Sequence, residues 1–296
     1  WLASRFNLGD GDALLADMEA AAQADPTDVL PTVLGPLVRW HTASSENAAN
    51  AALDTLPAAL TALGGDPAFN TLEAAAFLLG MDLPRPALEL LQTAEKAGIF
   101  QDAGPYPLYC MAYCRTRLSA RVGEDARALL LTAAAGTNPA APKPQHPHGA
   151  QALALMRWAV EFNPNDANAH YLLGLTLAGL HRASEAVPCW ERAAAINPGH
   201  GLAWRLLGLH RWKKDGNLEG AEIAYRNALA ALPNDQMVLR DLTEVLTKQG
   251  RRAEALALAE ALPEDSFRRY DLALWQAKAY LDEGRNDDCV AFLRES

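Results

Sequence analysis

The chain has 296 residues, of which 50% are hydrophobic and 21% are charged, and its formal net charge is −10 at pH 7. This composition argues against a disordered chain, and the acidic balance argues against a nucleic-acid backbone as a general partner. No charge-free apolar run reaches the roughly 18 residues that a membrane-spanning helix needs, so we expect no membrane span.

Helical spacing of apolar residues marks the first half, and no run alternates as a β-strand would. Helices are predicted near 10–24, 28–41, 46–63, 68–80, 84–98, 105–121 and 124–135, separated by turn sequences such as DPTD, GGDP and DLPRP. The acidic GDGD at 9–12 lacks the spacing of a calcium loop, so we interpret Asp10 or Asp12 as a helix cap. Residues 1–136 are therefore interpreted as diverged helical hairpins.

Four cysteines are too few for a disulfide framework, which favours a cytoplasmic location. A periplasmic location stays open because the chain begins at Trp1 instead of methionine. Cys110 and Cys114 lie four residues apart on one predicted helix face, but a metal ion would need two further ligands that the nearby sequence lacks. We interpret this pair as small residues at a helix contact, and we expect no metal and no cofactor.

A proline-rich loop, residues 137–148, separates the two halves, because its prolines exclude a helix. Two pairings are open around it. Either helix 124–135 pairs with helix 148–163, which we prefer, or 105–135 is a hairpin and the helix at 148 has no earlier partner. His146 and His148 form an H-x-H in this loop; because no carboxylate or cysteine adjoins them, we interpret the loop as solvated.

The second half carries a recurring pattern of small and large residues. In residues 167–200, Leu173-Gly174 fall in one helical run, Ala186 and Trp190 fall in a second run, and Pro198 ends the unit. A second copy places equivalent residues at Trp204, Leu207, Gly208, Ala221, Tyr225, Ala228 and Pro233, with one residue inserted within KKDGNLEG. An earlier half copy has Ala152, Met156 and Ala159, and less complete copies follow to the end of the chain. Small residues let two helices approach closely, and large residues fill the space beside them.

This pattern resembles the tetratricopeptide repeat family, whose motif combines W-x2-L-G-x2-Y, A-x3-F and P at a period of 34 residues. The resemblance is clear over 149–296 and weak over 1–148, where Ala75, Leu78, Ala87, Leu91 and Ala94 take the same spacings. It implies an all-α fold, an α-solenoid of stacked antiparallel helix pairs in a right-handed superhelix. We expect one continuous solenoid through both halves.

What the resemblance implies about function is a protein–protein interaction scaffold or adaptor that binds a partner peptide or helix in a concave groove lined by the first helices. The positions carried over are Asn168, Tyr171, Leu175, Arg205, Leu209, Trp212, Arg240, Glu244 and Lys278. The expected partner is another protein whose segment combines aliphatic anchors with acidic residues. The lysines and asparagines with which some family members grip a terminal carboxylate are missing, so that mode is not expected.

Other interpretations of these residues and of the function stay open. Packing between hairpins is the alternative for Tyr171, Leu175, Leu209 and Trp212, and a solvated face or an ion pair is the alternative for Arg205 and Arg240. Nucleophile-elbow, phosphate-loop and zinc-protease motifs are missing, so we predict a non-catalytic chain. The alternative function is the recognition arm of a larger protein- or glycan-modifying transferase or hydroxylase whose catalytic domain lies outside this chain. Self-association through the ends of the array is a third possibility.

Overall fold

The computed structural model describes residues 11–25, 28–119, 121–136, 147, 149–233, 235–260 and 270–295. Every regular element in these ranges is an α-helix, so the prediction of an all-α fold is confirmed. The chain divides into two compact units, residues 1–182 (unit 1) and 183–296 (unit 2). Because the predicted superhelix and the predicted domain boundaries concern how these parts join, they stay predictions.

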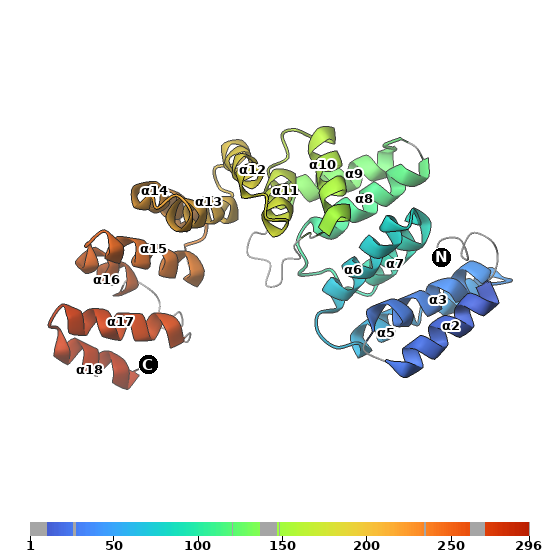
Figure 1. Cartoon of the computed structure of the whole chain (residues 1–296), viewed down its shortest axis with the longest axis horizontal. Coiled ribbons are helices and arrows are strands. Elements are labelled where there is room, and N and C mark those ends of the chain that lie inside the picture. Colours follow the sequence, from blue (N-terminus) through green and yellow to red (C-terminus); the bar gives the residue numbers. More distant parts are fainter. Residues whose placement is uncertain are drawn as a thin grey trace. The chain divides into compact units, whose positions relative to one another are not determined.

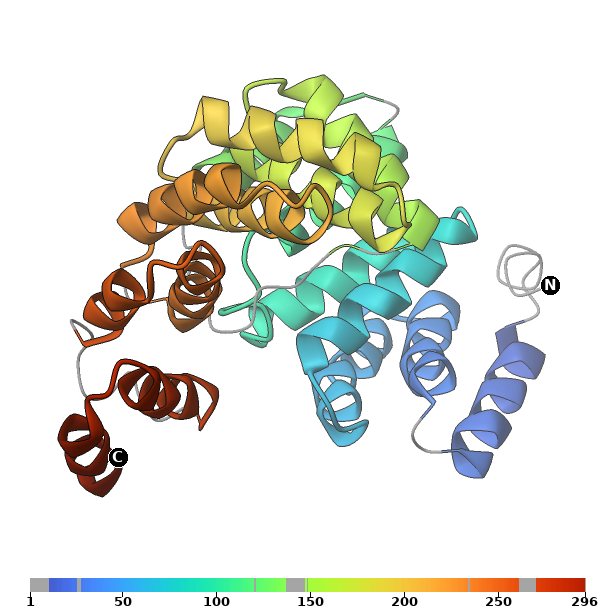
Figure 2. The ribbon, with the colours of Figure 1, turned by 60° about the vertical axis from the view of Figure 1, so that its left-hand side comes forward.

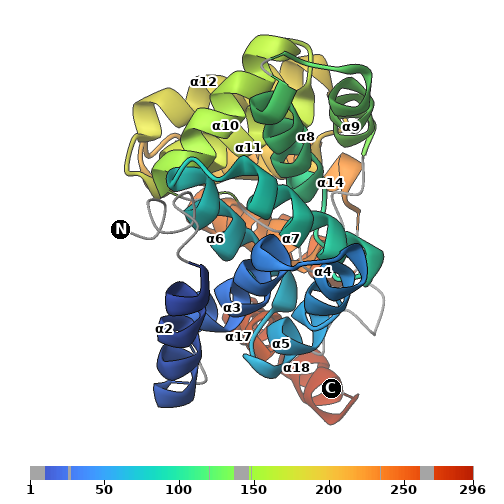
Figure 3. The ribbon, with the colours of Figure 1, turned by 90° about the vertical axis from the view of Figure 1, so that its right-hand side faces the viewer.

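Unit 1 is a stack of helices that pack largely as sequence neighbours (Figure 1). Its helices are α2 (Gly11–Ala24), α3 (Val29–Thr42), α4 (Glu46–Leu53), α5 (Leu56–Ala62), α6 (Pro67–Gly80), α7 (Pro84–Lys96), α8 (Tyr106–Ser119), α9 (Glu124–Ala135), α10 (Gly149–Phe162) and α11 (Ala167–Gly179). Figure 3 shows α2 to α5 at one end of this unit and α8 to α11 at the other, with α6 and α7 between them. All five residues of the weak repeat copy in α6 and α7 are buried, which supports its interpretation as a diverged unit.

Two expectations about the first half are wrong. The predicted helix over 46–63 is two helices, because α4 ends at Leu53 and α5 begins at Leu56 with Pro57 in its first turn. Proline has no amide hydrogen to donate back into a preceding turn, so a new helix begins there. The preferred pairing across the proline-rich loop is also wrong, since α9 packs against α8, whereas α10 packs against α11, α8 and α6.

Within unit 2, helices that are neighbours in the sequence pack against one another (Figure 2). Its helices are α12 (Ala183–Ile196), α13 (Gly201–Lys213), α14 (Leu218–Ala231), α15 (Gln236–Lys248), α16 (Arg252–Glu260), α17 (Tyr270–Asp282) and α18 (Asn286–Glu295). The predicted insertion lies between α13 and α14, where Asn217 accepts a 2.8 Å hydrogen bond from the Gly220 N–H and so begins the second helix. The helices α13, α15 and α17 are the first helices of three hairpins.

Side chains and turns fix where the first helices begin and end. Asp166 caps α11 and Asp235 caps α15, each through a carboxylate oxygen that accepts a 3.0 Å hydrogen bond from a backbone N–H of the first turn. At the other end, a residue with positive φ turns the chain, and the next N–H bonds to the carbonyl five residues earlier at 2.8 to 2.9 Å. These turn residues are His181, Gly250 and Gly284, with φ of 61°, 80° and 73°.

The core of unit 2 shows why the repeat pattern alternates small and large residues. A Cβ atom on Gly208 would lie only 2.8 Å from Cε1 of Tyr225, so the bare backbone of α13 touches the aromatic ring of α14. Tyr225 is fully buried, and its cluster also contains Trp212, Leu242 and Leu246. The expected close approach of two helices at Gly208, with a large residue filling the space beside it, is therefore confirmed.

Candidate partner-binding face

Each first helix presents the predicted partner-binding residues at the same helical positions. The helices α11, α13, α15 and α17 each have 13 residues; apart from Asn168, which is the second residue of α11, the candidates fall at the fifth, ninth and twelfth positions. These positions are spaced i, i+4 and i+7, so they lie along one stripe of a helix. In unit 2 the stripes consist of Arg205, Leu209 and Trp212; Arg240, Glu244 and Thr247; and Leu274, Lys278 and Leu281. We call these nine residues the first-helix face of unit 2.

The candidates in unit 1 have structural contacts. The Asn168 side-chain amide donates to the carbonyl oxygens of Ala133, Ala134 and Gly136 at 2.9, 3.3 and 2.6 Å, so it closes the C-terminal end of α9. Tyr171 is buried and Leu175 is half-buried. A partner-binding role for these three residues stays a prediction.

Arg205 and Arg240 hold a buried carboxylate. Asp241 on α15 is almost fully buried, and its two oxygens lie 3.6 Å from Nε of Arg205 and 3.2 Å from a terminal nitrogen of Arg240. The Tyr225 hydroxyl is buried close by, and both burial and the charge of Asp241 raise its pKa above the ordinary value. Tyr225 Oη, Arg205 Nε and Asp241 Oδ2 make no hydrogen bond within the described part of the chain. The cluster thus balances one buried negative charge with two arginines.

The middle of the face is partly core. Trp212 is buried in the hydrophobic cluster of unit 2, and Leu209 packs against that cluster. The Lys213 ammonium lies 3.2 Å from the centre of the Trp212 ring and 4.0 Å from the Glu244 carboxylate. Such a cation over an aromatic ring is favourable. Lys213 therefore covers the tryptophan and also neutralises the glutamate.

A pocket opens where α15, α16 and α17 meet. It has a volume of about 320 Å³, and it is lined by Glu244, Thr247, Lys248, Arg252, Lys278, Ala279 and Asp282. Two of the predicted residues, Glu244 and Lys278, are thus brought to one site. Three lining residues are cations and two are carboxylates, and Glu244 already has Lys213 beside it. The pocket is therefore positive on balance.

Sequence reasoning identified Lys278 on α17 but missed its neighbours. Leu274 and Leu281 occupy the equivalent stripe positions and are each 56% exposed. Lys248 and Arg252, which line the pocket, were also missed. The helical position itself was the available signal: the stripe that predicts Arg240, Glu244 and Thr247 on α15 predicts Leu274, Lys278 and Leu281 one hairpin later.

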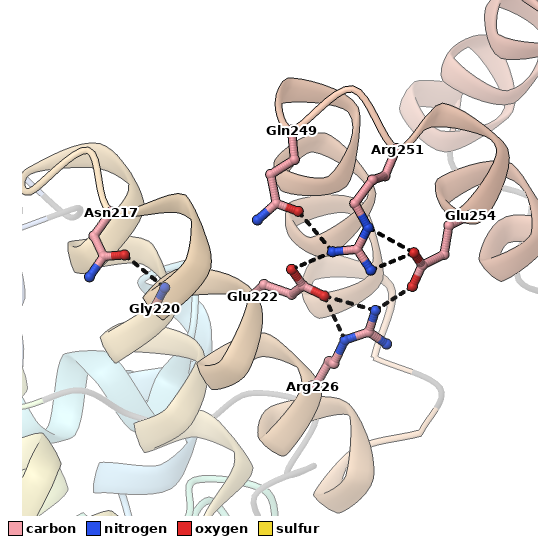
Figure 4. Close-up of polar contacts among 7 residues, drawn as sticks. All are labelled: Asn217, Gly220, Glu222, Arg226, Gln249, Arg251 and Glu254. Atoms are coloured by element: carbon pink, nitrogen blue, oxygen red, sulfur yellow. Dashed lines mark hydrogen bonds and ion pairs between the residues drawn. The ribbon is translucent and has the colours of Figure 1, made fainter.

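Within the described residues, two arginines on the second-helix side of unit 2 are paired with carboxylates, unlike the cations of the pocket. Figure 4 shows Glu222 of α14 between two arginines: its oxygens accept hydrogen bonds from Arg226 at 2.9 Å and from Arg251 at 2.7 Å. Both arginines also bond to Glu254 of α16. Burial raises the pKa of Glu222, but the hydrogen bonds from Arg251 and Arg226 outweigh it and hold that pKa below its ordinary value. This network links the second helices α14 and α16, and none of its residues belongs to the first-helix face.

The remaining candidate sites carry little chemistry. Cys110 and Cys114 are buried, and burial raises the pKa of the Cys110 thiol to about 12, which disfavours the thiolate that a metal would bind. Among the described residues, no three His, Cys, Asp or Glu side chains come together as metal ligands would. His146 and His148, like Asp10, lie outside the described residues.

None of the described helices combines the length and the apolar character that a membrane span needs.

Comparisons with known proteins give likenesses among solved structures. No family model matches the chain, and no curated protein matches it. TTC0263, a thermophilic TPR protein in Thermus thermophilus, is 21% identical with a TM-score of 0.39, over 72% of this chain and 99% of that chain. YrrB, a TPR protein with an unusual peptide-binding site, is 20% identical with a TM-score of 0.32, over 75% and 96%. MamA 41-end from Desulfovibrio magneticus RS-1 is 20% identical with a TM-score of 0.35, over 66% and 92%.

The repeat motif and its packing agree within unit 2. Gly208 contacts Tyr225, and the motif residues Ala221 and Ala228 of α14 are buried. Each first helix has the same length, and the predicted extra residue falls in the turn after α13. On these observations, the chain is an all-α protein built of helix pairs, and its repeat motif resembles that of the tetratricopeptide repeat family.

Proposed function

We propose that the chain is a non-catalytic protein-interaction module, and that a segment of another protein binds along the first-helix face of unit 2. The observation that carries this proposal is the exposed stripe on α17, where Leu274 and Leu281 leave most of their apolar surface in water on either side of Lys278. Apolar side chains that lie together on an exposed face and are bordered by polar residues are the kind of surface that marks an interaction site.

The face is suited to shallow contacts over several helices. Arg240 and Glu244 are each close to half exposed, and both lie one hairpin away from Lys278. Repeat arrays bind in this way, because each hairpin contributes a few side chains to a long surface. If the chain is instead the recognition arm of a larger enzyme, this face would likewise have to bind a partner segment.

Site-specific cross-linking tests the proposal. A photo-reactive amino acid is placed at Leu274 or Leu281, and the matched control carries it at Ile223, which is 60% exposed on the second helix α14. We expect one partner protein to be captured from the native cell at both α17 positions and not at Ile223. Equal capture at Ile223, or no capture at either leucine, would contradict the proposal.

The cross-linker is placed on α17, and no charge reversal of Arg205 or Arg240 is used, because both arginines contact the buried Asp241. Charge reversal of Arg205 and Arg240 would place two glutamates against a buried aspartate, which destabilises unit 2 whether or not these arginines touch a partner. Positions on α17 avoid this problem.

A further inference from the structure

The pocket between α15, α16 and α17 holds three cations that the described chain leaves without a carboxylate partner. Lys248, Arg252 and Lys278 are exposed, and none of them forms an ion pair within the described residues. By contrast, Arg226, Arg251 and Arg285 in the same unit each bond to at least one carboxylate. Since the two acidic lining residues are outnumbered and one is shared with Lys213, the pocket has room for one more negative charge.

The pocket adjoins the apolar part of the stripe. Leu274, Lys278 and Leu281 are spaced i, i+4 and i+7 on α17, so the two leucines lie along one side of the helix with the lysine between them. Covering an exposed leucine is favourable in proportion to the apolar surface that it removes from water. The lysine contributes little by itself, because an exposed ion pair is weak. A ligand gains most by covering the leucines and placing its charge at the pocket together.

We infer that the pocket receives the carboxylate of an Asp or Glu side chain from a partner protein segment, and that aliphatic residues flanking this carboxylate pack on Leu274 and Leu281. The inference rests on the proposed function and names the partner class for it. We expect an acidic residue in the pocket because of charge complementarity: Lys248, Arg252 and Lys278 come together there from three helices. We expect aliphatic residues on either side of the partner's carboxylate because Leu274 and Leu281 lie on either side of Lys278.

A phage-displayed random peptide library selected on the whole chain tests the inference. We expect the selected peptides to carry an Asp or Glu between aliphatic residues. Their Kd should rise by at least about tenfold with Lys278→Glu and with the double change Leu274→Ser and Leu281→Ser. Binding should also weaken with added salt, since the charges are exposed.

Matched controls separate binding from folding. Lys214→Glu reverses an exposed charge outside the pocket, and Ile223→Ser removes an exposed apolar side chain on α14. Both should leave the Kd unchanged, and all variants should unfold at the wild-type urea midpoint. Changing the acidic residue of a selected peptide to lysine should restore part of its binding to Lys278→Glu and to no other variant.

Three results would overturn the inference. The first is selection of peptides without an acidic residue, and the second is an unchanged Kd in Lys278→Glu. The third is displacement of the peptide by inorganic phosphate at modest concentration, which would make the pocket a general anion site. In each case, cross-linking at Leu274 still decides the proposed function separately. If the library yields no peptide that binds wild type and the cross-linking also fails, both ideas are wrong.

Discussion

The Tyr109 hydroxyl on α8 donates a 2.6 Å hydrogen bond to Oδ2 of Asp166, while the other oxygen of the same carboxylate caps α11. Both side chains are buried. Burial raises the pKa of Asp166, and the hydrogen bond from Tyr109 partly offsets that effect. One carboxylate therefore begins a helix and ties it to another helix 57 residues earlier in the sequence.

Removing this hydrogen bond should weaken unit 1. Tyr109→Phe leaves a buried carboxylate oxygen without its donor, so we expect the free energy of unfolding to fall by about 1 to 3 kcal/mol. Tyr113→Phe on the same helix is the matched control, because its hydroxyl only accepts a 3.3 Å bond from the exposed Arg117. Urea denaturation of both variants measures the difference. Equal losses would show that the buried bond contributes nothing of its own.

Gly208 should not tolerate a side chain. Alanine is the better helix former by about 1 kcal/mol, but its Cβ would overlap the Tyr225 ring, and overpacking typically costs about 1 to 3 kcal/mol. We therefore expect Gly208→Ala to destabilise unit 2. The control is Gly179→Ala at the end of α11, where nothing lies within 4 Å of the new Cβ, so it should be neutral or stabilising. Thermal unfolding compares the two.

Stability should fall in mild acid because of His200. Its Nδ1 accepts the Ala203 N–H at 3.2 Å, and burial lowers the pKa of this imidazole from 6.5 to about 4. The unfolded chain therefore takes up a proton before the folded chain does. The contribution of His200 is complete above about pH 6.5 and is lost between that pH and about pH 4, by up to about 3 kcal/mol.

The variant His200→Asn isolates this effect, because asparagine caps a helix without titrating in this range. The test is the urea midpoint as a function of pH. The variant should show a shallower decline than wild type between pH 6.5 and pH 4. Parallel curves for the two proteins would assign the decline to other groups.

Turn residues with positive φ should respond to glycine in opposite directions. His181 adopts a φ of 61°, which is unfavourable for a residue with a Cβ, so His181→Gly should stabilise the protein by up to about 1 kcal/mol. Gly250 adopts a φ of 80° in the equivalent turn, and Gly250→Ala should lower stability by a similar amount. Denaturant midpoints of the two variants should move to opposite sides of wild type.

The four thiols should differ in reactivity. Cys189 is half-buried, whereas Cys110, Cys114 and Cys289 are buried. Because the thiolate is the reactive form, the raised pKa of Cys110 slows its reaction further. We expect an aromatic disulfide reagent to label Cys189 first under native conditions and the other three only on unfolding, as mass spectrometry of digested protein would show. Early labelling of Cys110 would contradict the packing of α8.

Helix positions and hairpin turns were predictable because they depend on local chemistry. Proline, aspartate caps and turn glycines mark the helix ends, so most predicted helices agree with the structure to within about two residues. The helix over 46–63 failed because Pro57 allows either a first turn or an irregular continuation, and the sequence does not distinguish them. The close approach of α13 and α14 at Gly208 was predictable because a residue without a side chain leaves room for the neighbouring helix.

The exposure of the candidate partner-binding residues was harder to predict, because burial depends on what packs above each helix. Trp212 and Leu274 occupy outward stripe positions, yet Trp212 is buried and Leu274 is 56% exposed. Helical spacing gives the direction of a side chain but not whether a neighbouring helix or Lys213 covers it. Asn168 has an outward position for a similar reason, but its amide is used by the carbonyls of α9.

That amide has a practical consequence for dividing the protein. Asn168 and Asp166 lie after the proline-rich loop, but they hold α9 and α8, which lie before it. Protease cleavage at the prolines of residues 137–146 should therefore yield two pieces that co-elute on a sizing column and separate only in denaturant. A shortened chain that stops before Asp166 should be less stable than the cleaved protein, because both the buried phenol of Tyr109 and the last carbonyls of α9 would lose their hydrogen-bond partners.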